Sequence, residues 1–119
     1  WEQKINSDLR PTLIDDYIFT VSIEGYLTVI EKSSGNIIRI TDPFKNFKYK
    51  NRHKIQPTGF IVGKNNIYLT TNHGRLLTID IMTGKILNII KINNDKISRP
   101  LVLNQNLFII TDNSIIKLN

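Results

Sequence analysis

The sequence predicts an all-β fold built from stacked units of four short antiparallel strands. Three observations lead to this prediction: an internal repeat, a strand-forming composition, and a glycine at the end of each short turn. The repeat is the strongest of them, because a segment at 17–36 recurs at 66–85 and a shortened copy covers 106–119. Repetition at a fixed period indicates stacked copies of one supersecondary unit. We therefore expect a modular architecture within a single domain, residues 1–119.

The composition of the two full copies favours short strands. Their apolar runs are rich in Ile, Val, Thr, Tyr and Phe, which fit a pleated, packed surface, and Gly, Asn, Asp and Ser bound each run. In the first unit the expected strands are 12–14, 17–22, 26–32 and 36–40. In the second unit they are 60–62, 67–71, 75–81 and 85–91. Because β-branched runs disfavour helix, we expect strands throughout.

Glycine closes four short turns, at Gly25, Gly35, Gly74 and Gly84. Gly25 and Gly74 are 49 residues apart, and so are the other two, which means that the turns recur in register. Hairpin loops of about three to five residues often need one residue at positive φ, and Gly adopts it without a Cβ clash. We therefore expect a structural role for these four glycines.

The middle strand of each unit is apolar on both faces. In the second unit Leu77, Ile79 and Ile81 point one way, while Leu76 and Thr78 point the other. A sheet with one wet face would alternate apolar and polar residues more cleanly, so each small sheet is expected to lie between two neighbours. Four-stranded antiparallel sheets stacked in this way are the blades of a β-propeller.

The blade units are expected at about 6–41, 56–92 and 99–119, with a basic connecting loop at 42–56. Residues 1–5 are expected to form the last strand of a preceding blade. Propellers close with about four to eight blades, so about three blades are expected to be a fragment of a larger ring. We expect apolar end faces that bind the remaining blades, a protein partner or another copy of the chain.

The hairpin segments resemble a known repeat, the pyrroloquinoline quinone (PQQ) repeat, whose pattern is roughly D-G-x-L-Y-A-L-D-x-x-T-G-x-x-x-W. They read EGYLTVIEKSSGNII in the first copy and HGRLLTIDIMTGKIL in the second. The matching positions of the first copy are Gly25, Leu27, Ile30, Glu31 and Gly35. Those of the later copies are Gly74, Leu76, Ile79, Asp80, Thr83 and Gly84, then Ile115, Leu118 and Asn119. The resemblance implies a quinoprotein alcohol dehydrogenase-like propeller.

Two features of the family pattern have consequences for the blades. Glu31 and Asp80 occupy its acidic position, where we expect a structural hydrogen bond to the hairpin. The family's terminal Trp, which docks between blades, is missing from both full copies, and its place falls on Arg39 and Asn88. Trp1 is expected to be the docking Trp of the blade before. The loss of two docking residues predicts weaker locking between blades.

The family divides by function. Some members are dehydrogenases that hold PQQ and Ca²⁺ on the propeller axis, and others carry the repeat without a cofactor. The resemblance leads us to expect a non-catalytic protein-interaction scaffold in the periplasm or cell envelope, in envelope or outer-membrane protein assembly. The alternative is part of a PQQ-dependent dehydrogenase whose active-site residues lie outside these residues. PQQ with Ca²⁺ is expected as a cofactor only under that alternative.

Few residues have the pattern of a catalytic or metal site. Cysteine is absent, which excludes thiolate chemistry and the adjacent cysteine pair that the dehydrogenases use. Asp15 and Asp16 lie between two expected strands, where Asp favours a turn, with a metal role as the alternative. His53 and His73 lack metal-ligand spacing, and no nucleophile motif accompanies them. We assign no catalytic, cofactor-binding or metal-binding residue to this chain.

The connection at 42–56 is the most unusual segment, because basic and aromatic residues alternate along it. One interpretation is a partner-binding loop, and the residues that it would use are Phe44, Lys45, Phe47, Lys48, Tyr49 and Arg52. Its centre would be Phe47, Tyr49 and Arg52, because aromatics and Arg dominate hot spots. The other interpretation is a long crossing between blades whose aromatics pack inward and whose lysines face water. Connections of this length are often functional, so both interpretations stay open.

The net charge of +6 raises nucleic acid as a partner class. The chain is crowded with Ile, Lys and Asn and has no Ala, which indicates the codon bias of an AT-rich genome as the source of the charge. We therefore do not expect nucleic acid as a partner. No window approaches the roughly 20 apolar residues that a membrane helix requires, so no transmembrane segment is expected.

Overall fold

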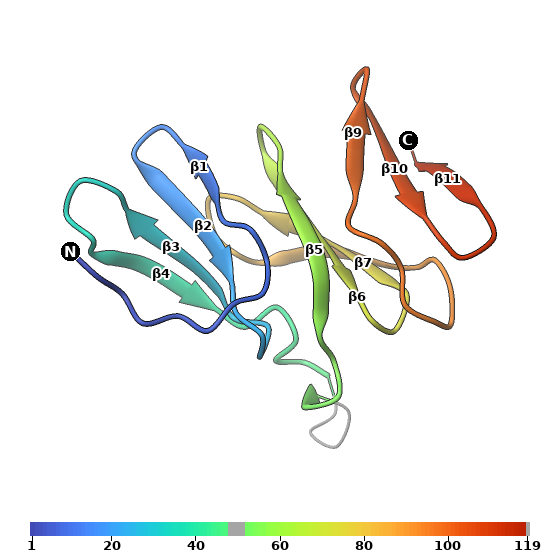
Figure 1. Ribbon diagram of the computed structural model, residues 1–119, viewed down its shortest axis with the longest axis horizontal. Helices are drawn as coiled ribbons and strands as arrows, with labels where there is room; N and C mark the ends of the chain where they lie inside the picture. The colour runs from blue at the N-terminus through green and yellow to red at the C-terminus, as the bar shows by residue number, and fades with distance from the viewer. Residues whose placement is uncertain (48–51, 119) are drawn as a thin grey trace.

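Three antiparallel sheets stand next to one another along the chain (Figure 1). The computed structural model describes residues 1–47 and 52–118. The first sheet has the strand order β1-β2-β3-β4, at Thr12–Ile14, Tyr17–Val21, Leu27–Glu31 and Ile37–Thr41. The second sheet has the order β5-β6-β7-β8, at Pro57–Val62, Asn66–Thr71, Arg75–Asp80 and Ile86–Lys91. The third sheet contains β9, β10 and β11, at Leu101–Leu103, Asn106–Ile110 and Ile115–Leu118.

Consecutive strands pair in every sheet, so each sheet is a simple meander. Short connections favour this arrangement, because an antiparallel neighbour is the only strand that a tight turn can reach. The prediction of an all-β fold made of stacked antiparallel units is therefore confirmed. The first two units have four strands each, and the shortened third copy has three strands in the part of the chain that is described.

The expected strand at 1–5 is wrong, because these residues pair with no described strand and a strand needs a ladder of backbone hydrogen bonds. Side chains fix this segment instead. The Trp1 indole Nε1–H donates to the Lys32 carbonyl at 2.7 Å, and the Gln3 amide Nε2–H donates to the Gly35 carbonyl at 2.7 Å. The indole also covers Gly35, where an added Cβ would lie 2.4 Å from the ring. Trp1 therefore packs on the β3–β4 turn.

The turns have the conformation that the glycines predict. The φ angles are 94°, 77°, 74° and 75° at Gly25, Gly35, Gly74 and Gly84. Acidic side chains complete the two outer turns. The Asp80 carboxylate accepts the amides of Met82 and Thr83 at 2.7 and 3.0 Å, and the Glu31 carboxylate accepts the Ser34 hydroxyl at 2.7 Å. These are the hairpin hydrogen bonds expected of Glu31 and Asp80.

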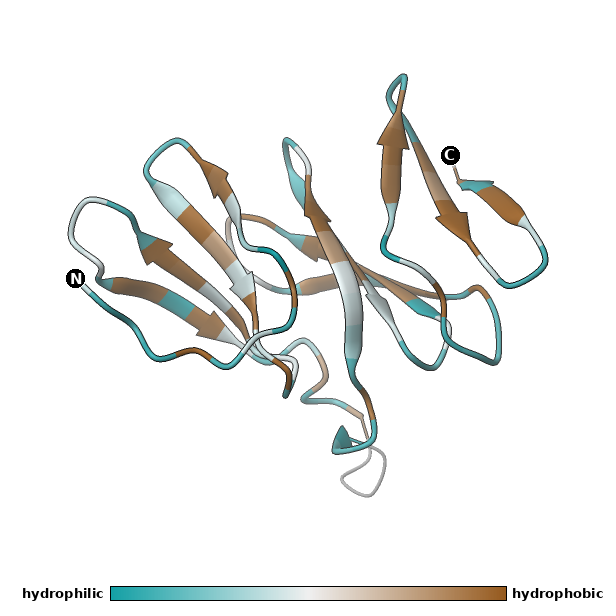
Figure 2. Cartoon of the chain, viewed as in Figure 1, coloured by the Kyte–Doolittle hydropathy of each residue, from teal (hydrophilic) through white to brown (hydrophobic). Residues whose placement is uncertain are grey.

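The main hydrophobic core lies between the first and second sheets, and Figure 2 shows hydrophobic residues along the strands of all three sheets. Its buried members are Phe19, Val21, Leu27 and Val29 of the first sheet, Phe60, Ile67, Leu69, Leu77 and Ile79 of the second, and Phe44 and Ile55 of the connection. A smaller cluster contains Leu76, Ile97 and Ile109. Because Leu76 and Leu77 are neighbours on β7 and belong to different clusters, the second sheet is covered on both faces, as the sequence predicts.

Arg39 on β4 joins the first sheet to the second. Its guanidinium donates to the Met82 carbonyl at 2.5 Å and to the Ile81 carbonyl at 2.8 Å, both in the β7–β8 turn. Thr41 packs on the same turn, because a Cβ added to Gly84 would lie 2.6 Å from its Cγ2. Two side chains of β4 therefore hold the next unit along the chain.

The contacts of Arg39 repeat those of Trp1 one unit later. Lys32, which binds Trp1, and Ile81, which binds Arg39, are 49 residues apart and so occupy the same position of the repeat. The absence of a Trp at position 39 predicted weaker locking between the units. The expectation of weaker locking stays a prediction, and at this junction a guanidinium makes two hydrogen bonds to the turn where the indole of Trp1 makes one.

Candidate functional site

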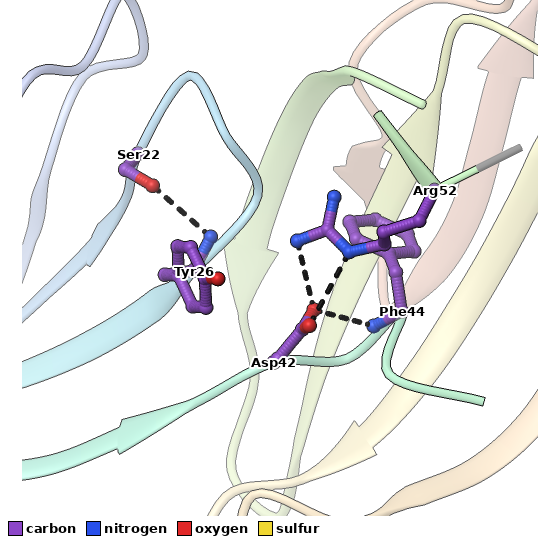
Figure 3. Close-up of polar contacts among 5 residues, drawn as sticks. All are labelled: Ser22, Tyr26, Asp42, Phe44 and Arg52. Carbon is purple, nitrogen blue, oxygen red and sulfur yellow. Dashed lines mark hydrogen bonds and ion pairs between the residues drawn. The ribbon is translucent and has the colours of Figure 1, made fainter. Parts of the chain in front are cut away.

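One ion pair, between Asp42 and Arg52, joins the two described parts of the connection between β4 and β5 (Figure 3). Arg52 donates to the Asp42 carboxylate through Nη2 at 2.9 Å and through Nε at 3.3 Å. The same carboxylate accepts the Phe44 amide at 3.0 Å. Both charged side chains are about one-fifth exposed, at 18% and 23%, so water screens the pair only in part. The pair therefore holds the start of the connection against Arg52, where its second described part begins.

Aromatic packing anchors the connection to the first sheet. Phe44 has no exposed surface, and its ring lies over Gly25, where an added Cβ would come within 2.7 Å of it. Phe47 packs on Phe44 edge to face, with ring centroids 5.7 Å apart. The Arg52 guanidinium lies 5.1 Å from the Phe44 ring centre and 5.6 Å from that of Tyr26, within cation–π range. The described part of the connection is thus a packed extension of the core.

The residues expected to bind a partner do not share one environment. Phe44 is buried and no partner can reach it, because its aromatic ring fills the core. Lys45 is exposed, while Phe47 and Arg52 are half-buried. Lys48 and Tyr49 lie outside the described residues. The inward packing of Phe44 agrees with the interpretation of this segment as a blade crossing.

An open cavity of about 260 Å³ lies where the connection meets the β6–β7 turn. We call it the cationic cavity, and its lining residues are Phe47, Lys54, Ile55, Thr71, His73 and Arg75. Phe47 and Ile55 supply apolar surface. Lys54 and His73 are exposed and Arg75 is half-buried, so positive or titratable groups surround this apolar surface.

Asn72 fixes the walls of the cationic cavity. Its side-chain amide donates to the Lys54 carbonyl at 3.0 Å, and its side-chain oxygen accepts the Gln56 amide at 2.9 Å. The His73 ring Nδ1 lies 3.0 Å from the same oxygen. A single side chain in the β6–β7 turn therefore determines the position of the connection and of His73.

A second cavity of about 350 Å³ lies on the other side of Ile55, against the β2–β3 turn. We call it the mixed cavity, because its lining includes acidic, basic and apolar residues, among them Glu24, Tyr26, Asp42, His53 and Ile55. Ile55 lines both cavities and belongs to the main core. The described part of the connection therefore forms a ridge between two hollows.

The other residues that the sequence singled out have structural surroundings. Asp15 has a φ of 52°, in the turn between β1 and β2. The Asp16 carboxylate accepts the Ser33 amide at 3.2 Å and the Ser33 hydroxyl at 2.9 Å, as expected for a turn residue. Among residues 1–47 and 52–118, no group of three or more His, Asp or Glu side chains could hold a metal ion. In the same ranges, no helix is long and apolar enough to cross a membrane.

Sequence analysis missed Lys54, Ile55, Asn72 and Arg75 as members of one site. Asn72 and Arg75 lie on either side of Gly74, the turn glycine of the second unit, which is the local sequence signal for this turn. The pairing of this turn with the connection has no local signal, because it depends on which face of the second sheet the connection crosses.

Comparison with solved structures shows which known architecture the three sheets resemble. No protein-family model and no curated protein sequence matches the chain. BamB from Moraxella catarrhalis superposes with a TM-score of 0.70 at 13% identity, over 96% of this chain and 32% of BamB. The β-propeller domain of Cps50 (Swd1) from Myceliophteria thermophila has a TM-score of 0.67 at 16% identity, over 79% of this chain and 31% of that domain. The chain has the fold of consecutive β-propeller blades.

Quinoprotein enzymes share the same architecture. Quinohemoprotein alcohol dehydrogenase ADHIIG from Pseudomonas putida HK5 has a TM-score of 0.67 at 19% identity, over 92% of this chain and 17% of the enzyme. The chain thus spans about a third or less of the length of the solved structures that it matches. Identities this low show the fold alone, so the function has to be argued from the site.

Proposed function

We propose that this chain is part of a non-catalytic β-propeller that acts as a protein-interaction scaffold in envelope or outer-membrane protein assembly. The observation that carries the proposal is the ridge formed by the connection, with an open cavity on each side. Binding residues are commonly found on loops that a rigid scaffold presents in one conformation. The similarity of the fold to BamB supports the proposal, as does the resemblance of the hairpins to the PQQ repeat.

The packing of the described part of the connection explains how this part can present a fixed surface. Phe44 is inserted into the core, and the Asp42–Arg52 pair closes the loop, so a partner would not have to pay the full entropy of ordering it. Phe and Arg are enriched at the core of protein interfaces, and Phe47 and Arg52 each line one of the two cavities.

Site-specific photo-crosslinking in the native host tests the scaffold function. A photoreactive amino acid at Lys45, on the connection, is expected to give a discrete protein adduct. The same amino acid at Lys64, an exposed lysine in the β5–β6 turn, is the matched control and is expected to give none. Equal adducts at both positions, or no adduct at Lys45, would contradict a partner at this surface.

The second candidate is part of a PQQ-dependent dehydrogenase whose active-site residues lie outside these residues. The similarity to quinohemoprotein alcohol dehydrogenases supports this candidate. Absorbance titration of the full-length protein with PQQ and Ca²⁺ separates the two, because a scaffold is expected to leave the cofactor spectrum unchanged. Micromolar binding would reject the scaffold in favour of the dehydrogenase.

The setting and the assembly of the chain are part of the same proposal. The resemblance to the PQQ repeat supports a periplasmic or cell-envelope location, which cell fractionation tests. The three residues of β9, Leu101, Val102 and Leu103, are exposed at 43%, 58% and 64%. An apolar patch of this kind is expected to bind the remaining blades of the propeller or a second copy of the chain.

A further inference from the structure

The cationic cavity is a formed site whose walls come from three separate elements. Phe47, Lys54 and Ile55 belong to the connection, while Thr71 and His73 lie at the β6–β7 turn. Arg75 opens β7 and completes the lining. Asn72 bonds to the backbone on both sides of Ile55, so the spacing between the connection and the turn is set before any partner binds.

The positive charge of this cavity has no carboxylate partner among the described residues. The ion pair found in that part of the chain joins Arg52 to Asp42, which leaves Lys54 and Arg75 without an acidic neighbour at ion-pair distance. Arg75 is held in place by carbonyl groups, since its Nη1 donates to His73 at 2.8 Å and to Asn93 at 3.3 Å. A guanidinium oriented in this way and not neutralised is suited to an incoming carboxylate.

The apolar surface between these charges is equally well defined. Ile55 is 6% exposed and belongs to the core, and the edge-to-face contact with Phe44 orients the Phe47 ring. A volume of about 260 Å³ is below the range of about 300–1,000 Å³ that small-molecule sites usually occupy. It suits one apolar side chain next to an acidic one better than a whole cofactor.

We propose that the cationic cavity binds a short acidic segment of a partner protein, in which a carboxylate pairs with Lys54 and Arg75 and a neighbouring aliphatic or aromatic side chain packs on Phe47 and Ile55. This proposal rests on the scaffold function and names the chemistry of the partner. Cations without an acidic neighbour suit a negatively charged occupant, and the apolar surface suits a hydrophobic residue beside the charge.

The charge around the cavity favours an acidic peptide over nucleic acid. Across Ile55 the mixed cavity presents the Glu24 carboxylate and the Asp42–Arg52 ion pair, so the positive charge of the cationic cavity does not continue along the ridge. A phosphate chain carries a negative charge at every nucleotide and would meet the Glu24 carboxylate, with no continuous basic surface, once it left the cationic cavity in this direction. A peptide can place its acidic residue in one cavity and a neutral or basic residue beside the other.

Fluorescence anisotropy with the full chain tests the proposal. The probe is a short fluorescein-labelled peptide in which aspartate alternates with leucine. We expect it to bind at least about tenfold more tightly than the same peptide with asparagine in place of aspartate, because hydrogen bonds to charged groups are lost. Replacing leucine by serine in the probe is also expected to weaken binding, since the apolar contact is lost.

Two variants assign the binding to the cavity. Lys54→Gln leaves the backbone contacts of Asn72 intact and is expected to weaken binding about threefold, the effect of one exposed charge. Arg75→Gln is expected to weaken it at least about tenfold. Lys64→Gln is the control, because Lys64 is an exposed lysine on the β5–β6 turn, and this variant should bind the peptide as the parent chain does. Lys54→Gln keeps the test valid if Arg75→Gln fails to fold.

Several outcomes would overturn the proposal. The first is equal binding of the aspartate and asparagine peptides, and the second is unchanged peptide affinity in Lys54→Gln. The third is a single-stranded oligonucleotide that binds the parent chain more tightly than the peptide does and loses affinity in Lys54→Gln. If the peptide fails while the Lys45 crosslink persists, this proposal is rejected and the scaffold function stands. PQQ binding by the full-length protein rejects the scaffold whatever the peptide does.

Discussion

The junction between the first and second sheets is filled far more fully than the junction between the second and third. Within the described residues, eleven buried hydrophobic side chains form the first junction's cluster and three form the second's. The connection adds Phe44 and Ile55 to the first, whereas the chain between β8 and β9 adds Ile97 to the second. Arg39 reaches across the first junction, while its repeat counterpart Asn88 is exposed on β8.

This difference separates what the repeat determines from what the connections determine. The repeat sets the strands and turns, which are alike in the first two units. The junctions depend on residues outside the repeat, because an apolar sheet face is buried only as far as the neighbouring sheet and the crossing segment cover it. On β8, five of six residues are exposed, although the strand sequence ILNIIK is mostly apolar.

The largest effect is expected for Phe44→Ala. Removal of a buried aromatic ring leaves a cavity in the first junction and is expected to lower the free energy of unfolding by about 3–5 kcal/mol. Urea denaturation measures the loss. Ile97→Ala, the matched change in the second junction, removes a smaller side chain and is expected to cost less. A greater loss for Ile97→Ala would reverse the comparison between the two junctions.

The next effect concerns the contact that Arg39 makes across the first junction. Arg39→Ala removes two hydrogen bonds from a charged donor and is expected to lower the free energy of unfolding by about 1.5–3 kcal/mol. Arg39→Lys should retain only part of the stability that Arg39 contributes, because an ammonium cannot reproduce the forked geometry of a guanidinium. Asn88→Ala should stay within about 0.5 kcal/mol. Equal losses at positions 39 and 88 would remove this contrast between the junctions.

A smaller effect is expected for the ion pair that closes the connection. A double-mutant cycle with Asp42→Asn and Arg52→Gln should give a coupling energy of about 1 kcal/mol, the upper end for partly exposed pairs. Added salt should reduce the coupling, since mobile ions screen the exposed part of the pair. A coupling of zero at low salt would mean that aromatic packing alone holds the connection.

The smallest effect on stability is expected for Val102→Lys on β9, within about 0.5 kcal/mol, because this side chain is 58% exposed. Its effect should instead be on association, and sedimentation velocity should show a lower average mass than for the parent chain. Met82→Lys is the control, because Met82 is 80% exposed on a turn and away from the sheet faces. Unchanged sedimentation of Val102→Lys would argue against association through β9.

Features encoded by adjacent residues were predictable from the sequence. The positive φ at Gly74 and the opposite faces of Leu76 and Leu77 follow from turn chemistry and from the two-residue period of a strand. Inward packing of Phe44 was one of two interpretations of the connection, and the sequence could not decide between them, because burial required knowing that the connection passes over Gly25. The role of Arg39 depends on carbonyl groups 42 and 43 residues away, and no local pattern encodes such a contact.

The position of Ile55 would couple binding of the proposed peptide to the docking of the first two sheets. Its side chain belongs to the core between the first two sheets and also lines both cavities. A ligand seated against it therefore binds only while those sheets remain docked, and by thermodynamic linkage it raises their resistance to separation. The reciprocal also holds. Any substitution that destabilises the packing between the two sheets would lower the affinity for the ligand, even at a residue that the ligand does not contact.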